Sequence, residues 1–405
     1  MNLIYIHSNF PGQFIDIAPF VAKNIASRTI FLTVSDNPQQ IRLEGVEVVR
    51  FKTHRQPSSD VHRYLHSSEK AVLLGQAVLR AVDQLCNDGF VPDVAVVHGG
   101  EGLGLYLKTL LPDLRLISYM EWYFNPRNSN CLFDEFSVDD SLYIQTRNWP
   151  IVQELMVADE IVTPTQWQRQ QFPLPWREKI HVIFDGIDTR LFCPAVVDGP
   201  LHLNASNSSA GLLLESDTQV LSFATRGMEP LRGFPEFMRA AAVAQQANLN
   251  LHVVVAGRDC AAYSYQSPHQ SGSWKDYMIE ELDGQLDLSR IHFVGLVTYS
   301  DLVQLYRRSN LHCYFTRPYV VSWSIFEAAA CGTRLLINNF SGLDEVFEFA
   351  PSLPPVNLDD QDTINTGVLE GLRVPRNVEE VPLSNLRAGN DLISACSKWY
   401  DLLKS

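Results

Sequence analysis

The feature that most constrains the fold is a regular alternation of short apolar runs with longer amphipathic runs along the whole chain. Short apolar runs bounded by turn residues indicate buried strands, and longer runs with a 3.6-residue apolar period indicate helices. Strands that alternate with helices pair in parallel, because each crossover returns the chain to the same end of the sheet. We therefore expect an α/β protein whose parallel sheets are covered by helices.

The expected strands and helices fill both halves of the chain. Strands are predicted near Leu3–His7, Thr29–Val34, Val46–Phe51, Asp93–His98, Leu114–Tyr119, Glu160–Thr163, Ile180–Phe184, Val220–Ala224, Leu251–Ala256, Ile291–Val294, Leu311–Phe315 and Leu335–Asn338. Helices are predicted over Gly12–Ala26, Ser68–Cys86, Phe234–Ala247 and Asn385–Leu403.

The length of the chain indicates two domains. Its 405 residues are too many for one ordinary hydrophobic core. The strand pattern breaks after Gly186, and a small, polar stretch, Asn204–Gly211, is typical of a surface loop. We place a first domain at 1–190 and a second at 191–384.

Composition limits the classes of function. Apolar residues make up 46% of the chain and charged residues 19%, and the formal charge is −14, which argues against a dedicated nucleic-acid binder. The seven cysteines include no Cys-x-x-Cys pair, and no apolar run approaches the ~20 residues of a membrane helix. No secretory leader is evident, so we expect a cytoplasmic protein.

One basic cluster stands out in this acidic chain. It either faces an anionic acceptor or membrane headgroups, or it belongs to a solvated loop. Its members are Arg50, Lys52, His54, Arg55, His62, Arg63, His66 and Lys70.

The most informative segment is Phe315–Asn338, which reads as strand, loop, short helix and strand. Ser322 is a suitable N-cap, and Ser322 and Ser324 flank Trp323 at the start of the helix. A helix N-terminus presents free N–H groups and the positive end of the dipole, which suits a phosphate. Glu327 is an unusual acid among alanines. The alternative is a structural helix with one satisfied glutamate.

Glycine-containing loops follow several strands. Gly12 opens the helix after the first strand, and Gly257 ends a strand of the second half. Leu296 follows Gly295 at the end of the next strand. The carboxyl ends of parallel strands are where open α/β sheets bind ligands, so we expect these loops to approach one.

Two arginines lie six residues apart on the glycine-rich loop Ala224–Phe234. Arg226 and Arg232 have the planar donor forks that clamp a diphosphate. The alternative is a pair of solvated surface arginines.

Polar and aromatic side chains also follow two strands of the first half. His98 and Glu101 lie where one strand enters a glycine-rich loop, and Glu121 and Trp122 follow the next strand. His98 and Glu101 are candidate acid–base groups near the ligand, or structural residues. Trp122 either stacks on a ligand or packs. Asp360-Gln361-Asp362 superficially matches a metal motif, but we interpret it as solvated surface.

These motifs resemble family 4 of the retaining glycosyltransferases. Glu327-Ala-Ala-Ala-Cys-Gly332 is similar to the second half of the family's donor-site signature. Arg226 and Arg232 match its Arg…Lys-Gly element with an arginine in place of the lysine, and the Gly12 loop resembles its first glycine loop. Asp185–Pro194 resembles its interdomain signature.

The resemblance implies a GT-B fold: two doubly wound Rossmann-like domains, an interdomain cleft and a C-terminal helix, about 385–405, that returns to the first domain. It implies a retaining, metal-independent hexosyltransferase that uses a nucleotide-diphosphate sugar as co-substrate and needs no cofactor. Glu327 would bind the ribose, and the loop of Leu296 would hold the base. Tyr319 and Glu121 depart from the family: Tyr319 stands where a glutamate holds the donor sugar, and Glu121 where a histidine is common.

By this resemblance Arg226, Arg232 and Glu121 would carry catalysis. The donor site would add Gly12, Ser322, Trp323, Ser324 and Gly257. The acceptor stays open between a glycan, a lipid, a natural product and a protein, and the oligomeric state stays open too. Two alternatives remain: a GT-B sugar-nucleotide epimerase, and a weakly active or inactive partner subunit, which the Tyr319 departure favours.

Overall fold

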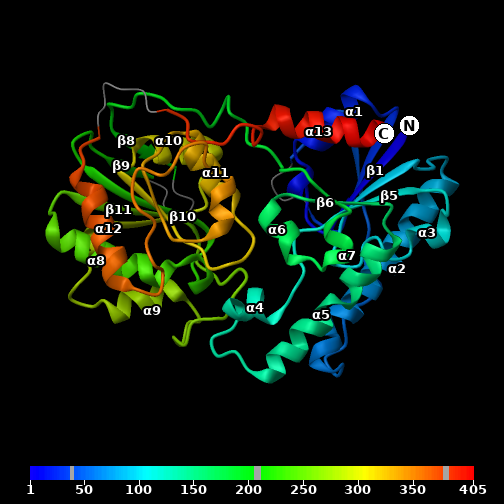
Figure 1. The fold of residues 1–405 in the computed structure, drawn as a ribbon, viewed down its shortest axis with the longest axis horizontal. Helices are drawn as coiled ribbons and strands as arrows, with labels where there is room; N and C mark the ends of the chain where they lie inside the picture. Colours follow the sequence, from blue (N-terminus) through cyan, green and yellow to red (C-terminus); the bar gives the residue numbers. More distant parts are fainter. Residues whose placement is uncertain (37–40, 205–210, 377–382) are drawn as a thin grey trace. The chain divides into compact units, whose positions relative to one another are not determined.

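The computed structural model describes residues 1–36, 41–204, 211–376 and 383–405 (Figure 1). Its internal contacts divide the chain into two compact units. Unit 1 comprises Met1–Ser129, Glu135–Gly186 and Asp391–Ser405, and unit 2 comprises Asn130–Asp134 and Ile187–Asn390. The chain leaves unit 1 at Gly186 and returns at Asp391, within a few residues of the expected positions.

Unit 1 is built on a seven-stranded parallel sheet. Its strands are β1 (Asn2–His7), β2 (Arg28–Thr33), β3 (Val46–Arg50), β4 (Val94–His98), β5 (Arg115–Tyr119), β6 (Glu160–Thr163) and β7 (Ile180–Val182). They follow the spatial order β3-β2-β1-β4-β5-β6-β7.

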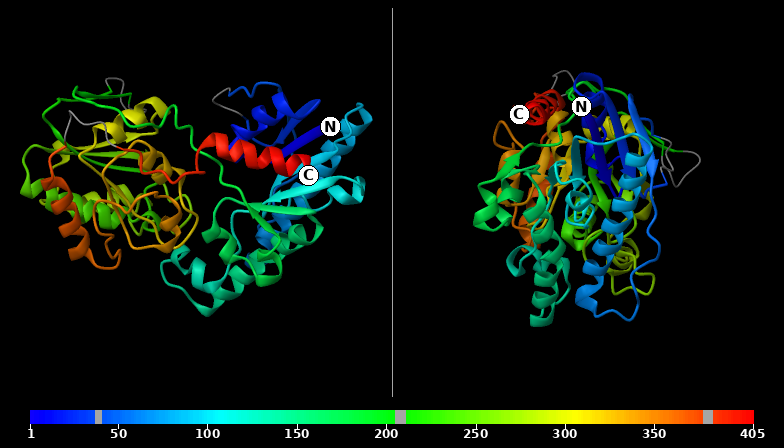
Figure 2. Two further views of the ribbon diagram at one scale, coloured as in Figure 1. Left: turned by 45° about the horizontal axis from the view of Figure 1, so that its top comes forward. Right: turned by 90° about the vertical axis from the view of Figure 1, so that its right-hand side faces the viewer.

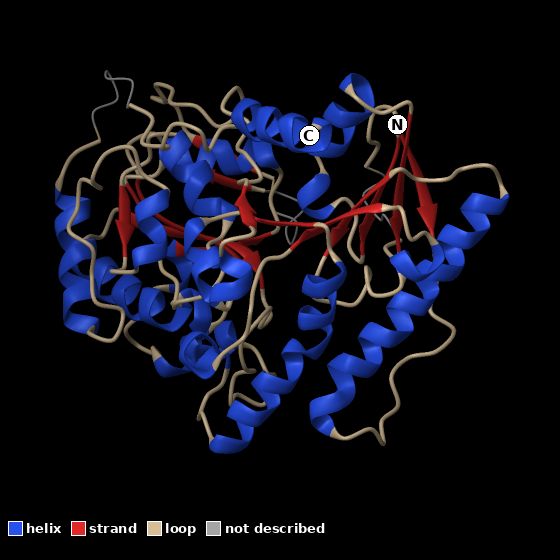
Figure 3. Ribbon diagram, turned by 45° about the vertical axis from the view of Figure 1, so that its right-hand side comes forward, coloured by secondary structure: helices blue, strands red, loops and turns tan. Residues whose placement is uncertain are grey.

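Helices cover both faces of this sheet (Figure 3). They are α1 (Ile17–Asn24), α2 (His66–Asn87), α3 (Leu107–Leu110), α4 (Pro126–Ser129), α5 (Val138–Val157), α6 (Gln166–Gln171), α7 (Leu174–Arg177) and α13 (Leu392–Lys404). Short 3-10 turns of unit 1 are η1 (Gly12–Phe14) and η2 (Arg63–Leu65), whereas η3 (Asn130–Leu132) belongs to unit 2.

Alternation along the strands separates two cores in unit 1. Leu3 and Tyr5 of β1 pack with α1 and with Trp399 of α13, whereas Ile4 and Ile6 pack with α2 on the other face. Successive side chains of a strand point to opposite faces, so a strand that is apolar throughout needs cover on both. The C-terminal helix α13 lies beside α1 and near the N-terminus (Figure 2). Its apolar residues therefore complete the core of unit 1.

Unit 2 repeats the design with a five-stranded parallel sheet in the order β12-β11-β10-β13-β14. Its strands are β10 (Gln219–Gly227), β11 (Leu251–Arg258), β12 (Ile291–Gly295), β13 (Leu311–Tyr314) and β14 (Leu335–Ile337), and β8 (Leu201–Leu203) pairs antiparallel with β9 (Leu212–Leu214) in a separate ribbon. The helices are α8 (Phe234–Ala247), α9 (Trp274–Glu281), α10 (Tyr299–Arg308), α11 (Trp323–Ala330) and α12 (Gln361–Arg373), with turns η4 (Pro230–Arg232), η5 (Leu288–Arg290) and η6 (Ser341–Glu345).

The expected α/β class and the doubly wound sheets are confirmed. Every predicted strand is present with boundaries shifted by a few residues, and α8 has the predicted bounds. The predicted helix Gly12–Ala26 is instead η1 followed by α1. The helix α5, with Pro150 inside it, and the ribbon β8–β9 were not anticipated. Residues 205–210 of the predicted loop lie outside the described residues.

The strand order identifies where each sheet can bind a ligand. In unit 1 the winding reverses between β1 and β4, and in unit 2 it reverses between β10 and β13. At such a switch point the two following loops diverge and leave a crevice at the carboxyl ends of the strands. The residues that follow β1, β4, β10 and β13 are therefore the first candidates for function.

Candidate functional site

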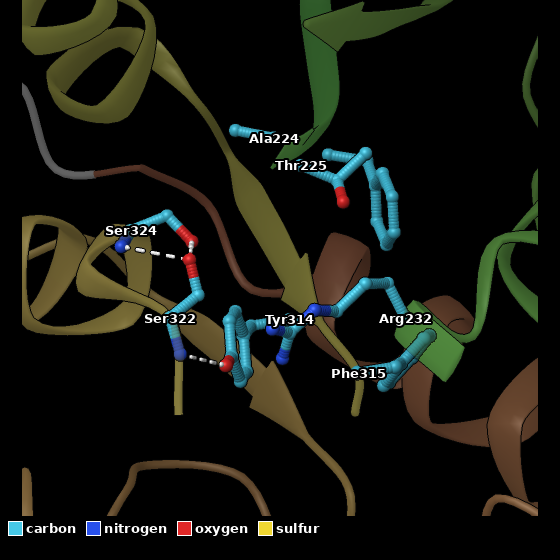
Figure 4. Close-up of a pocket in the computed structure, with 8 residues that line it drawn as sticks. Ala224, Thr225, Arg232, Tyr314, Phe315, Ser322 and Ser324 are labelled. Atoms are coloured by element: carbon cyan, nitrogen blue, oxygen red, sulfur yellow. Dashed lines mark hydrogen bonds between the residues drawn. The ribbon is translucent and has the colours of Figure 1, made fainter. Parts of the chain in front are cut away.

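The switch point of unit 2 holds a small pocket (Figure 4). Side chains from the end of β10, from η4, from the end of β13 and from the start of α11 converge on it. The lining residues are Phe223, Ala224, Thr225, Arg232, Tyr314, Phe315, Ser322 and Ser324. Three of the predicted donor-site residues, Arg232, Ser322 and Ser324, thus share one pocket, although Arg232 and Ser324 are 92 positions apart in the sequence.

Arg232 is buried in this pocket with only 5% of its surface exposed. Its Nη1 donates hydrogen bonds to Thr316 Oγ1 at 2.8 Å and to the carbonyl of Val320 at 3.0 Å. It forms no ion pair with any carboxylate of the described residues. A buried guanidinium that meets only neutral oxygens keeps a strong attraction for an anion.

Arg226 is exposed and lies under an aromatic ring. Its Nη1 donates to Tyr263 Oη at 2.9 Å, and its Cζ lies 5.6 Å from the centre of the Tyr263 ring. The Cζ of Arg232 lies 5.6 Å from the same ring centre. The two arginines therefore converge on one tyrosine from the loop after β11.

A fully buried carboxylate, Glu229, fixes that tyrosine loop. Its Oε2 accepts hydrogen bonds from Tyr263 N at 2.9 Å, from Ser264 N at 2.7 Å and from Ser264 Oγ at 3.0 Å. Its Oε1 has no hydrogen-bond partner among the described residues. Because Glu229 lies between the two arginines in sequence, it ties the loop after β11 to the arginine loop.

The helix α11 begins at the pocket as predicted. Ser322 caps it, with Oγ accepting from Ser324 N at 3.4 Å and from Ser324 Oγ at 3.0 Å. The N–H of Ser322 donates to Tyr314 Oη at 3.0 Å. Trp323 is the first residue of the helix and is half-buried. These hydroxyls and the helix N-terminus face the same space as Arg232.

Glu327 lies one turn further along α11 with 6% of its surface exposed. No hydrogen bond to its carboxyl is formed within the part of the chain that the structure describes, and burial raises its pKa to about 8. A buried carboxyl without donors favours its neutral form. A ligand hydroxyl would supply the missing partner.

Three other residues predicted for the donor site are not among those that line this pocket. Tyr319 is buried, and its ring centre lies 5.8 Å from that of Tyr263. Gly257 has φ +141°, and a Cβ there would lie 2.1 Å from the carbonyl oxygen of Thr225, so only glycine lets β11 pass β10 at this point. Leu296 is half-exposed after β12.

The switch point of unit 1 holds a directed hydrogen-bond chain. Asn9 N donates to His7 Nδ1 at 2.9 Å, which leaves the proton of the neutral ring on Nε2. His7 Nε2 lies 2.7 Å from Gln13 Oε1, and Gln13 Nε2 donates to Glu121 Oε1 at 2.8 Å. His98 Nε2 lies 3.3 Å from Glu121 Oε2. Two strand ends, β1 and β4, thus converge on Glu121.

The two histidines of this hydrogen-bond network have pKa values shifted in opposite directions. Burial, aided by His98, lowers the pKa of His7 to about 3, so His7 stays neutral. Burial opposes the charge of His98 as well, but the Glu121 carboxylate outweighs it and raises the pKa of His98. The hydrogen bond and charge of His98 likewise overcome burial and lower the pKa of Glu121. The rings of His7 and His98 stack with centres 4.1 Å apart.

Gly12 makes room for this arrangement. Its φ is +55°, and a Cβ there would lie 2.3 Å from His7 Nε2. Any side chain at position 12 would therefore displace the ring that bonds Gln13. Glycine is therefore required by the close approach to His7, and the approach of this loop to a ligand stays a prediction.

The loop after β4 depends on Glu154 of α5, a residue that the sequence did not single out. Its buried carboxylate accepts from Gly100 N at 2.5 Å and from Gly104 N at 2.9 Å, although burial raises its pKa to about 7. Glu101 lies in the same loop, 3.8 Å from Lys70 Nζ. Trp122 is buried, with its ring centre 6.5 Å from that of Trp167, so it packs and offers no free face.

Ion pairs reduce the charge of the basic cluster. Arg55 bonds Glu69 at 2.6 Å, Arg63 pairs with Asp139 and Asp140, and Arg50 pairs with Asp36. Lys70 pairs with Glu101 as described above. Half of the cluster's eight basic residues therefore have acidic partners, which makes the cluster less suited to bind an anionic surface. Membrane contact stays a prediction.

Asp360 and Asp362 lie at a helix end. Asp360 Oδ1 caps α12 by accepting from Asp362 N at 3.1 Å. Both aspartates are exposed, in agreement with their interpretation as solvated surface. Among the described residues, no three His, Cys, Asp or Glu side chains are grouped to hold a metal ion. The same residues form no helix long and apolar enough to cross a membrane.

Comparison with known proteins agrees with this geometry. Residues 26–192 match the family model described as "Glycosyl transferase family 4 group", and residues 235–356 match one described as "Glycosyl transferase-like". Together the two matches cover well over half of the chain. No curated protein sequence matches it.

Solved structures share the fold at low sequence identity. A sucrose-phosphate synthase from Thermosynechococcus elongatus is 14% identical with a TM-score of 0.70, over 100% of this chain and 98% of that one. A trehalose-phosphate synthase from Burkholderia vietnamiensis is 12% identical with a TM-score of 0.61, over 100% of both chains. An E. coli protein named for trehalose-6-phosphate, bound to UDP-2-fluoro glucose, is 12% identical with a TM-score of 0.59, over 100% and 96%.

Proposed function

Because this chain belongs to the glycosyl transferase family 4 group and has the GT-B fold, we propose that unit 2 holds its nucleotide-sugar donor at the switch-point pocket, with the diphosphate on Arg226 and Arg232. The sugar passes to an acceptor with retention of the anomeric configuration. The observation that carries this proposal is that Arg232 is buried, bonds neutral oxygens and has no ion pair among the described residues. A charge removed from water is strongly destabilising unless an opposite charge accompanies it, and a diphosphate supplies that charge.

The two arginines stabilise the leaving group. When the sugar–oxygen bond breaks, negative charge grows on the diphosphate, and donors already aimed at it lower the barrier without reorganising. Arg232 is held by Thr316 and Val320 before the donor arrives. The N-terminus of α11, capped by Ser322, adds backbone N–H groups on the same side. In this proposal catalysis rests on charge placed in advance and needs no metal or cofactor.

Glu327 binds the ribose of the nucleotide. Its carboxyl has no hydrogen-bond partner in the described part of the chain, and its pKa is raised to about 8. The ribose hydroxyls donate to it and so favour its charged form. The backbone next to Gly257 and Leu296 lies at the ends of neighbouring strands β11 and β12, and we assign it to the base.

Glu121 orients the acceptor hydroxyl within unit 1. His98 lowers its pKa, and a carboxylate with a low pKa is a weak proton acceptor. Its two oxygens are already fixed by Gln13 and His98, so the group is positioned rather than mobile. We therefore favour an orienting role over a general-base role. His98 and Glu101 stay candidates on the acceptor side, and a place in the cytoplasm stays a proposal.

Thermal unfolding with a panel of nucleoside diphosphates and their sugar conjugates tests the donor site. A ligand at 100 times its dissociation constant adds about 2.7 kcal/mol of apparent stability. We expect one base to raise the melting temperature, and Arg232→Ala to abolish the rise. Arg373→Ala, at the exposed end of α12, is the matched control. If no compound shifts the wild type, the donor site is refuted and the partner-subunit alternative, favoured by Tyr319, takes precedence.

Product analysis with the identified donor separates transfer from epimerisation. A transferase releases the nucleoside diphosphate in step with glycosylated acceptor, whereas an epimerase interconverts sugar nucleotides without an acceptor. Interconversion in the absence of any acceptor would contradict the transfer proposal.

A further inference from the structure

We infer that the exposed ring of Tyr263, backed by the buried ring of Tyr319, forms an aromatic surface that binds the donor sugar, an inference that rests on the proposed function of the arginine pair. Tyr263 lies on the loop after β11 and was not indicated by the sequence. Its ring centre lies 5.6 Å from the Cζ of each arginine and 5.8 Å from the ring centre of Tyr319. One tyrosine thus borders both the diphosphate groups and the second tyrosine.

The position of Tyr263 follows from Glu229. Three hydrogen bonds of 2.7–3.0 Å hold the backbone of Tyr263 and the Ser264 residue after it to this buried carboxylate. The side chain of Tyr263 remains 38% exposed, so its ring is fixed at the base and open at the surface. A ring placed in this way contacts a ligand without losing conformational freedom on binding, which raises affinity.

The covalent structure of the donor places the sugar next to these rings. The sugar is bonded directly to the diphosphate. A diphosphate on Arg226 and Arg232 therefore brings the pyranose next to the surface that Tyr263 and Tyr319 border. A pyranose presents axial C–H groups on one face, and an aromatic ring contacts that face while excluding water. The Tyr263 hydroxyl, which now accepts from Arg226 at 2.9 Å, lies at the junction of diphosphate and sugar.

Tyr319 also changes the charge of the site. The family carries a glutamate at this position, and a carboxylate there would neighbour Val320, whose carbonyl already accepts from Arg232 at 3.0 Å. A carboxylate there would add negative charge near the arginine pair and repel the diphosphate. With Tyr319 the pair has no acidic partner among the described residues, and the sugar is recognised by an apolar face rather than by a carboxylate. The substrate class is therefore a nucleotide sugar with an accessible axial C–H face.

The test compares dissociation constants, measured by calorimetry, for the nucleoside diphosphate and for its sugar conjugate. The constant for the nucleoside diphosphate divided by that for the sugar conjugate reports the contribution of the sugar alone. For Tyr263→Ala we expect the ratio to fall by about fivefold, because one aromatic contact is worth about 1 kcal/mol. Tyr263→Phe, which keeps the ring, should retain the ratio. Tyr299→Ala on α10 is the matched control, since this tyrosine is 50% exposed in the same unit.

Tyr319→Glu gives an opposite and independent readout. Tyr319→Glu should weaken nucleoside diphosphate binding by about tenfold, because the new carboxylate adds negative charge that repels the diphosphate. A ratio unchanged in Tyr263→Ala, or tighter nucleotide binding in Tyr319→Glu, would overturn the inference and leave the diphosphate site standing. Failure of the wild type to bind any nucleoside diphosphate would instead refute the proposed function itself.

Discussion

Arg232 Nη1 donates to Thr316 Oγ1 at 2.8 Å, and this hydrogen bond joins the loop after β10 to the loop after β13. These strands flank the switch point of unit 2, so the bond spans the crevice in which the fold binds ligands. It also explains why the planar fork matters here: Nη1 bonds Thr316 and Val320, while the remaining N–H groups stay available.

The first prediction concerns that fork. Arg232→Lys keeps the charge but has a single ammonium, which cannot bond Thr316 and Val320 and still present two parallel donors. We expect nucleoside diphosphate affinity to fall by about 10-fold in Arg232→Lys and about 100-fold in Arg232→Ala, from charge-assisted hydrogen bonds of about 1.5–3 kcal/mol. Calorimetric titration measures both. Equal affinity for the wild type and Arg232→Lys would show that only charge is recognised.

The second prediction concerns the charge of His98. Its pKa is raised by Glu121, so its stabilising contribution is fully present below the unfolded value of about 6.5 and is lost as pH rises through the folded value. Glu121, with a lowered pKa, contributes above about 4.5 and loses its contribution as pH falls through its folded value. The pair therefore stabilises unit 1 most between about pH 4.5 and 6.5.

The variant Glu121→Gln isolates this pair. The stability difference between wild type and variant, from urea unfolding, should be larger at pH 6 than at pH 9. In the NMR spectrum the His98 ring should titrate above 6.5 in the wild type and lower in the variant. His7, whose pKa is lowered to about 3, should show no titration between pH 5 and 8 in either protein and serves as the internal control. A His98 pKa unaffected by Glu121→Gln would contradict the assignment.

The third prediction couples nucleotide binding to a proton. The Glu327 carboxyl is protonated below its raised pKa of about 8, and ribose hydroxyls would lower that pKa. Binding at pH 7 should therefore release a proton, and affinity should rise as pH approaches 8. Calorimetry in buffers with different ionisation enthalpies counts this proton. Glu327→Gln should bind without proton release, and release that persists in this variant would assign the proton elsewhere.

The raised pKa of Glu327 also predicts how the stability of the ligand-free protein depends on pH. Because the folded pKa of Glu327 is raised, its charged form opposes folding, and the penalty grows as pH rises from about 4.5 to about 8. Glu327→Gln should therefore stabilise the free protein at pH 9 and change it little at pH 4. Urea unfolding at the two pH values measures the difference. Equal effects at both would indicate a hydrogen-bonded carboxylate.

The fourth prediction separates steric clash from backbone strain. Gly257 and Gly284 both have positive φ, but a Cβ at 257 would lie 2.1 Å from the Thr225 carbonyl oxygen, whereas nothing lies within 4 Å at 284. Gly284→Ala should lower the free energy of unfolding by about 1 kcal/mol, from strain alone. Gly257→Ala should lower it by several times as much. Equal losses of unfolding free energy at the two positions would show that β10 and β11 move apart at Gly257 without an energetic cost.

The amino-acid sequence alone determined the class of the fold and indicated most residues of the proposed donor site. Alternating apolar and amphipathic runs are local patterns, and they placed every strand that forms the two parallel sheets. Arg226, Arg232, Ser322 and Glu327 follow strands or begin helices, so their neighbourhood could be predicted from the rule that parallel strands share a carboxyl edge. Gly12 and Gly257 were likewise visible as residues, though not the atoms they avoid.

Only the tertiary structure decided which residues complete these sites. No local pattern marks four residues of these sites: Tyr263, Glu229, Gln13 and Glu154. Their roles arise from contacts with residues distant in sequence; Glu229 and Tyr263, for example, are 34 positions apart. Burial also separated the two alternatives for Trp122: its ring is buried, which favours packing over stacking on a sugar. Whether a side chain faces a ligand or a core depends on the elements packed over it, and a linear pattern does not contain that information.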